Sequence, residues 1–64
     1  MTPLQAVHEV ARELGEAGVP SPRVDAEYLV GHVLGLTRSQ LYAVDDALGA
    51  GESDRLRALV ERRR

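Results

Sequence analysis

Two histidines, His8 and His32, have the side chains best suited to acid–base chemistry or metal binding. His8-Glu9 begins like the zinc-protease motif, but that motif needs a second histidine four residues later, where this chain has Arg12. His32 follows Tyr28 by one helical turn, so the two share a face. We therefore interpret His8 as a surface side chain, and His32 as half-buried and bonded to a backbone carbonyl or to Tyr28. A catalytic or ligand role for His32 is the weaker alternative.

The densest group of charges consists of Arg23, Asp25 and Glu27. Arg23 and Glu27 have the i, i+4 spacing of a helical ion pair, and Asp25 suits the positive end of a helix. A surface cluster explains this pattern. The alternative is that Arg23 and Asp25 join the start of this helix to a second domain or a partner protein, because interfaces favour arginine. Arg23, Asp25, Glu27 and His32 are our candidates for partner or interdomain contact.

The sequence predicts no catalytic, cofactor-binding or metal-binding residue. Asp45 and Asp46 are adjacent, but no third acid accompanies them, so we expect a solvated turn. The chain lacks cysteine, which excludes disulfides and thiolate zinc sites. It also lacks a glycine-rich nucleotide loop, a nucleophile elbow and the Asp-Ser-Leu setting of an acyl carrier. We therefore expect a binding role rather than catalysis.

Composition predicts one small helical domain over residues 1–64 with an aliphatic core. The chain has 64 residues, no Trp or Phe, and a formal net charge of −2. Such a charge repels phosphate backbones, so we expect no nucleic-acid partner. No stretch approaches the roughly 20 apolar residues of a membrane span, and the N-terminus lacks the basic region followed by an apolar region that is typical of a signal peptide. We expect a cytoplasmic protein without a membrane partner.

The longest apolar element predicts a central helix at about residues 22–34. Ser21 is a suitable N-cap, Pro22 suits the first helical position, and Gly35 suits a left-handed C-terminal position. Its apolar residues form two stripes, so we expect neighbours on more than one side. The first stripe contains Ala26, Leu29, Val30 and Val33, and the second contains Val24, Tyr28 and His32.

The flanking sequence predicts three further helices, and hence an all-α bundle of four to five helices. The pairs Thr2/Gln5 and Thr37/Gln40 form capping boxes that open the first and third helices, and Gly18 ends the first. The fourth helix begins at about Ala50. The expected inward residues are Leu4, Val7, Val10, Ala11 and Leu14, then Leu41, Tyr42 and Val44, then Leu48 as a loop anchor, and finally Leu56, Leu59 and Val60.

The end of the fourth helix has a basic run, Arg62 to Arg64, which the helix dipole alone can explain. An electrostatic contact site is the weaker alternative. Arg63 occupies the next position of the apolar stripe of this helix. We therefore expect the chain to be a fragment of a larger protein.

The stretch AGVPSPRVDAEYLVGHVLGLTRSQLY resembles the N-terminal helical domain of the release-factor glutamine methyltransferase family, also called PrmC or HemK. The likeness extends more weakly over the rest of the chain. Gly49-Ala50-Gly51 departs from the family pattern, which has Ser or Thr followed by Pro and an acid. The matching residues are Ala17-Gly18, Ser21-Pro22-Arg23, Asp25-Ala26-Glu27, Leu29-Val30 and His32-Val33-Leu34-Gly35.

The resemblance implies a parent enzyme that uses S-adenosylmethionine to methylate the glutamine of the Gly-Gly-Gln motif in class I peptide-chain release factors. The family's cofactor motif and its Asn-Pro-Pro-Tyr motif have no counterpart here, so this fragment would recognise the release factor and contact the parent's catalytic domain. One alternative is a free-standing helical protein-interaction module. Another, a DNA-binding helix-turn-helix, is disfavoured by the acidic balance.

Overall fold

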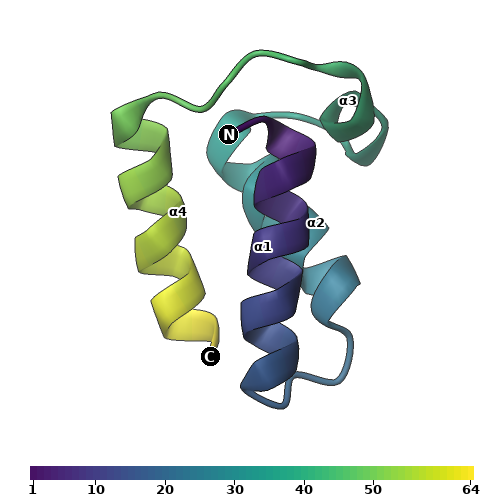
Figure 1. Cartoon of the computed structure of the whole chain (residues 1–64), viewed down its shortest axis with the longest axis vertical. Helices are drawn as coiled ribbons and strands as arrows, with labels where there is room; N and C mark the ends of the chain where they lie inside the picture. Colours follow the sequence, from purple (N-terminus) through teal and green to yellow (C-terminus); the bar gives the residue numbers. More distant parts are fainter.

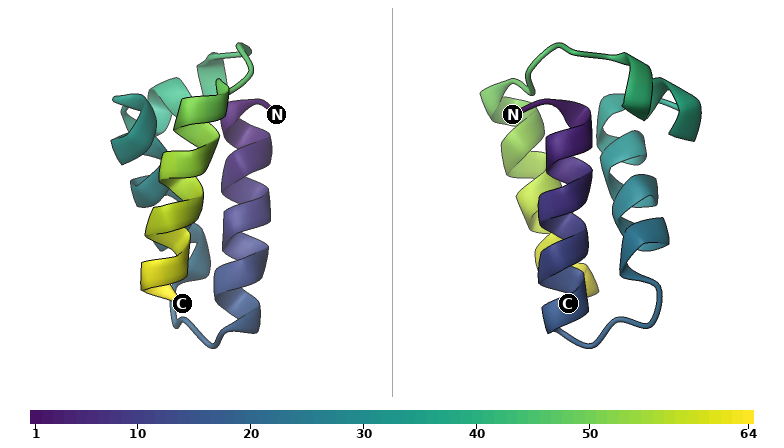
Figure 2. Two further views of the ribbon diagram at one scale, coloured as in Figure 1. Left: turned by 90° about the vertical axis from the view of Figure 1, so that its left-hand side faces the viewer. Right: turned by 45° about the vertical axis from the view of Figure 1, so that its right-hand side comes forward.

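The computed structural model describes residues 1–64 and contains four helices and no strand, which confirms the predicted all-α bundle. The helices are α1 (Pro3–Glu16), α2 (Pro22–Leu34), α3 (Arg38–Ala43) and α4 (Ala50–Arg63). The three longer helices lie side by side, and α3 crosses one end (Figures 1 and 2). α1 and α4 run in one direction and α2 runs in the other (Figure 1). None of the helices has both the length and the apolar character that crossing a bilayer requires.

The capping signals of α1 work as predicted. The Thr2 hydroxyl accepts a hydrogen bond from the Gln5 amide, and the Gln5 side chain accepts one from the Thr2 amide. At the other end Gly18 has a φ of 87°, and the Val19 N–H donates to the Leu14 carbonyl at 3.0 Å. This backbone reversal turns the chain toward α2.

The predicted inward face of α1 is correct except at Leu4. Leu4 is only half-buried, because the face that meets the bundle is rotated toward the side that carries Ala6. Ala11 is partly buried and packs against the core, as predicted. The fully buried residues of this helix are Pro3, Ala6, Val7, Val10 and Leu14.

The ends of α2 also follow the sequence, with one exception. Pro22 begins the helix and Gly35 adopts a left-handed φ of 68°. The Ser21 side chain forms no capping hydrogen bond, so the predicted cap is wrong in that respect. Ser21 lies between two prolines, and with ψ at 67° it departs from the extended conformation typical of a capping residue.

The core contains eleven apolar residues from all four helices. α2 contacts each of the other three helices, and so does α1. The first predicted stripe of α2 is buried, but the second is exposed, with Val24 at 61% and Tyr28 at 70%. The two-sided burial we expected is therefore wrong, since the three neighbours leave this strip of α2 uncovered. The core residues are Ala6, Val7, Val10, Leu14, Ala26, Leu29, Val30, Val33, Leu41, Leu56 and Val60.

The second half of the chain is held by one short helix, one loop anchor and α4. The predicted capping box Thr37/Gln40 is present, and Leu41 is buried, whereas Tyr42 is 44% exposed rather than inward. Leu48 packs against the core as expected, and its N–H donates to the Met1 carbonyl at 2.8 Å. These contacts fix the segment that connects α3 to the start of α4.

α4 begins at Ala50, as predicted. The Glu52 carboxylate accepts from the Gly49 N–H, which is half of a capping box, because glycine has no side chain to complete it. Leu56 and Val60 are buried and Leu59 is half-buried. This helix therefore covers the open side of the α1–α2 pair with one narrow apolar strip.

Candidate functional site

The predicted contact residues lie on α2, and Glu27 is the centre of a network that joins α2 to α3. Its side chain is only 6% exposed and accepts a hydrogen bond from the Tyr42 hydroxyl. Arg38 Nε lies 3.1 Å from one carboxylate oxygen and Arg23 Nε lies 3.7 Å from the other. Arg23 also donates to the Tyr42 hydroxyl at 3.0 Å. Glu27 is therefore a buried, fully partnered carboxylate rather than part of an exposed cluster.

These neighbours determine the charge of Glu27. The hydrogen bond from Tyr42 lowers its pKa from the usual 4.5, and the positive charges of Arg38 and Arg23 act in the same direction. Burial acts in the opposite direction without reversing the result. Glu27 is therefore ionised at neutral pH, which suits an ion-pair centre and not a general acid.

Asp25 forms an ion pair with an arginine of α4. Arg63 Nη2 lies 3.0 Å from Asp25 Oδ2, and Arg63 Nε lies 3.2 Å from the same oxygen. This pair joins the start of α2 to the end of α4. Arg63, which breaks the apolar stripe of α4, thus joins α4 to α2 at the surface of the bundle.

His32 is exposed, so the expectation of a half-buried histidine is wrong. Its ring stacks on Tyr28, with centroids 6.1 Å apart and planes at 14°, as its helical spacing allows. Beside them, Val24, Gly31 and Arg38 help to line an open hollow of about 600 Å³ between α2 and α3. The exposed strip of α2 is thus an aromatic and apolar ridge next to a shallow concavity.

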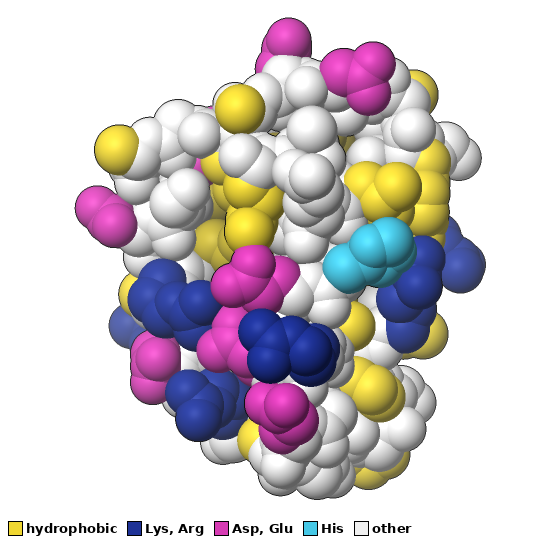
Figure 3. Space-filling view, viewed as in Figure 1, with side chains coloured by type: hydrophobic (Ala, Val, Ile, Leu, Met, Phe, Trp, Pro, Cys, Tyr) yellow, Lys and Arg dark blue, Asp and Glu magenta, His cyan; other side chains and the backbone are white.

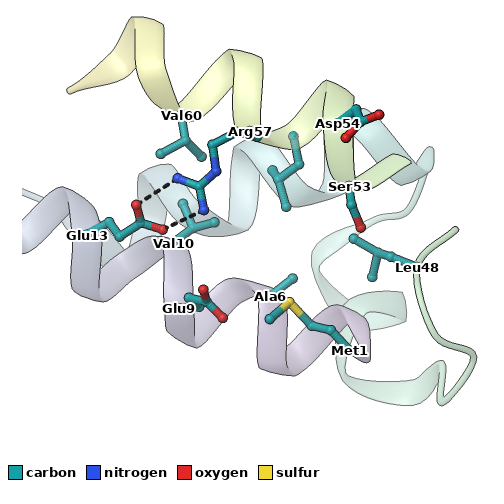
Figure 4. Close-up of a pocket in the computed structure, with 11 residues that line it drawn as sticks. Met1, Ala6, Glu9, Val10, Glu13, Leu48, Ser53, Asp54, Arg57 and Val60 are labelled. Atoms are coloured by element: carbon teal, nitrogen blue, oxygen red, sulfur yellow. Dashed lines mark hydrogen bonds and ion pairs between the residues drawn. The ribbon is translucent and has the colours of Figure 1, made fainter. Parts of the chain in front are cut away.

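A second hollow, of about 380 Å³, lies between α1 and α4. Hydrophobic side chains are visible there, above a band of acidic and basic side chains (Figure 3). One end is crossed by Arg57 and Glu13, and Met1 and Leu48 lie toward the other (Figure 4). Its lining consists of Met1, Ala6, Glu9, Val10, Glu13, Leu48, Ser53, Asp54, Leu56, Arg57 and Val60.

The Glu13–Arg57 pair is bidentate, with distances of 2.7 and 3.0 Å. The hydrogen bond from Arg57 lowers the pKa of Glu13 from 4.5, and partial burial opposes this. Both groups are therefore charged at neutral pH and fasten α4 to α1. No three His, Cys, Asp or Glu side chains lie close enough together to hold a metal ion. Both hollows are open surfaces lined by apolar and charged side chains.

The comparison with known protein families decides the assignment. A model described as the PrmC N-terminal domain matches residues 5–64. The chain belongs to this family. The resemblance inferred from residues 17–42 therefore holds for nearly the whole chain.

Relatives of this PrmC N-terminal domain include three release factor glutamine methyltransferases. The protein of Streptomyces coelicolor is 46% identical over 44 residues, 69% of this chain and 16% of that protein. The protein of Mycolicibacterium smegmatis is 49% identical over 47 residues, which are 72% and 17% of the two chains. That of Moorella thermoacetica is 38% identical over 64 residues, or 98% and 23%. The chain thus spans less than a quarter of these relatives, and no solved structure gave a significant match.

Within this PrmC N-terminal domain, the sequence predicted the Arg23–Glu27 pair and the shared face of Tyr28 and His32, but missed the partners of Glu27 on α3. Tyr42 lies fifteen residues after Glu27 in the chain, so no local spacing relates them. The one available signal was Tyr42 itself, an aromatic residue on a helix of only six residues, which cannot turn every large side chain inward. Arg38, also missed, follows the capping residue of that helix.

Proposed function

We propose that this chain is the recognition domain of an S-adenosylmethionine-dependent protein glutamine methyltransferase that acts in the cytoplasm during translation termination. Its substrate would be the glutamine of the Gly-Gly-Gln motif in class I peptide-chain release factors. The match of residues 5–64 to the PrmC N-terminal domain carries this proposal. The names of the three relatives give the reaction and the substrate class.

The side chains of this domain indicate a role in binding rather than in catalysis. Glu27 and Asp25 are engaged in ion pairs within the chain, and the sequence offers no candidate residue for methyl transfer. We therefore assign cofactor binding and catalysis to the parent's other domain, and binding of the release factor or of that domain to this one. Arg23 and His32, both exposed, are the contact candidates, and Glu27 and Asp25 position the helix that carries them.

Nuclear magnetic resonance of the isotope-labelled chain tests this role. Addition of a class I release factor should shift the amide signals of one contiguous face that includes His32. His32→Ala should weaken binding a few-fold, whereas His8→Ala, at another exposed histidine, on α1, should have no effect. If no signal shifts while the full-length enzyme binds the release factor normally, the recognition role is wrong.

The free-standing interaction module stays a second candidate, because the exposed ridge of α2 suits a binding partner whether or not an enzyme is attached. The gene sequence beyond Arg64 distinguishes the two. A following S-adenosylmethionine-binding domain supports the methyltransferase, and an open reading frame without one supports the module.

A further inference from the structure

The exposed apolar side chains of this small protein are unevenly distributed. Its exposed large hydrophobic residues are Met1, Val24, Tyr28 and Tyr42, and the last three belong to α2 and α3. Val24 and Tyr28 are one helical turn apart, and Tyr28 extends the ridge to His32 by ring stacking. We call Val24, Tyr28 and His32 together the α2 ridge. An apolar ridge that the fold leaves in water is a recognised feature of binding surfaces.

Arginines border the α2 ridge on both sides. Arg38, on α3, lines the hollow that contains the three ridge residues. On the other side, Arg55 and Arg62 of α4 line a hollow of about 240 Å³ together with His32. Arg55 and Arg62 take part in none of the seven ion pairs of the structure. Two guanidinium groups beside the ridge are thus without a carboxylate partner.

The nearby carboxylates do not neutralise this surface. Glu27 is buried and shared by two arginines, and Asp25 is paired with Arg63. On α4, Asp54 lines the hollow toward α1, and Glu61 pairs with Arg57 and Arg64. The chain as a whole has a net charge of −2, yet the ridge is bordered by positive side chains. The charge distribution is therefore polarised between the two sides of α4.

We propose that the α2 ridge is the docking site for an acidic protein segment, which places an apolar side chain against Val24 and Tyr28 and directs carboxylates to Arg38, Arg55 and Arg62. This inference rests on the proposed function in taking the segment to belong to the release factor. Guanidinium groups pair with carboxylates in a bidentate geometry, and Tyr and Arg are the residues that contribute most at protein interfaces. The ridge has both.

A protein segment fits this surface better than a nucleic acid. A nucleic-acid site combines a dense run of cations with a net positive domain, whereas here the arginines flank an apolar centre and the domain is acidic overall. The α1–α4 hollow has an acidic excess, with Glu9, Glu13 and Asp54 but only one arginine, Arg57, around an apolar floor. An acidic segment would be repelled there, so charge selects the ridge.

Two designed peptides test the chemistry of the ridge without the release factor. One is a helical peptide with leucines on one face and glutamates beside them, and its twin has lysines in place of the glutamates. The glutamate peptide should shift the amide signals of Val24, Tyr28, His32 and Arg55 in the labelled chain, and the lysine peptide should not. Shifts located at the α1–α4 hollow, equal shifts with both peptides, or tighter binding of a single-stranded RNA would overturn the proposal.

Binding of the release factor itself is the second test. Arg55→Glu should weaken its binding about fivefold, because an attraction becomes a repulsion. Arg12→Glu, the matched charge reversal on α1, should change it less than about twofold. If the wild-type chain binds the release factor and Arg55→Glu weakens binding no more than Arg12→Glu does, the docking site is wrong but the proposed function is not. Wild-type chain that binds the glutamate peptide at the ridge but no release factor contradicts the proposed function alone.

Discussion

Glu27 shows how one side chain can be both part of a surface pattern and a structural centre. The spacing between Arg23 and Glu27 is that of an ordinary surface pair, but Tyr42 and Arg38 of α3 pack against the Glu27 carboxylate. A buried carboxylate is costly unless each oxygen has partners, and this one has them. The side chain therefore helps to fix the position of α3 on α2, next to the α2 ridge.

Replacement of this carboxylate tests that role. We expect Glu27→Gln to lower the free energy of unfolding by about 1–2 kcal/mol, because Tyr42 keeps an acceptor while Arg38 and Arg23 lose a charge partner, and both arginines still reach solvent. Urea denaturation followed by circular dichroism measures the change. Glu16→Gln breaks the exposed Arg12–Glu16 pair and should leave stability unchanged. Equal stability of the two variants would assign Glu27 no structural role.

Among the elements, the α2–α3 turn is closely packed against the end of α2. Gly35 reverses the chain with a positive φ, and the Leu36 N–H then donates back to the Gly31 carbonyl at 3.0 Å. A Cβ added at Gly31 would lie 2.8 Å from the Leu36 carbonyl oxygen, and also near Leu41. Backbone atoms cannot rotate away as a side chain can, so Gly31 is needed for the turn to close.

Gly31→Ala should therefore destabilise the protein by about 1–3 kcal/mol, the usual cost of excess volume in a packed site. Gly51→Ala is the matched control, since no atom lies within 4 Å of its added Cβ and the position is helical. That variant should be more stable than wild type by up to about 1 kcal/mol, because alanine loses less conformational entropy in a helix than glycine. Thermal unfolding of both distinguishes the cases, and a neutral Gly31→Ala would show that the turn can relax.

The helix boundaries could be predicted because their signals are local. Thr2 with Gln5, Thr37 with Gln40, Gly18 and Gly35 each act within a few residues of their own position. The exposure of Tyr28 and the burial of Glu27 could not be predicted this way. They depend on the positions of α3 and α4 in the bundle. The periodicity of α2 shows which residues share a face, but not which helix packs against that face.

At the scale of the whole molecule, two ionised glutamates each join two different helices. Glu13 fastens α1 to α4 through Arg57, and Glu27 fastens α2 to α3 through Tyr42 and Arg38. The core beneath is aliphatic and small, and a domain of this size has only a few kcal/mol of net stability. Loss of either contact is thus a sizeable fraction of the total.

Acid should therefore weaken the fold. The pKa values of both glutamates are lowered in the folded state, Glu13 mainly by Arg57 and Glu27 mainly by Tyr42, from a usual value of 4.5. Their stabilisation is fully present above that value and is lost as the pH falls through the lowered pKa, because the unfolded chain binds the protons first. Urea midpoints measured as the pH is lowered from 6 to about 3 should decline. The double variant Glu13→Gln, Glu27→Gln should be less stable at pH 6 and show a shallower decline, and a decline as steep as that of wild type would assign the acid sensitivity to other carboxylates.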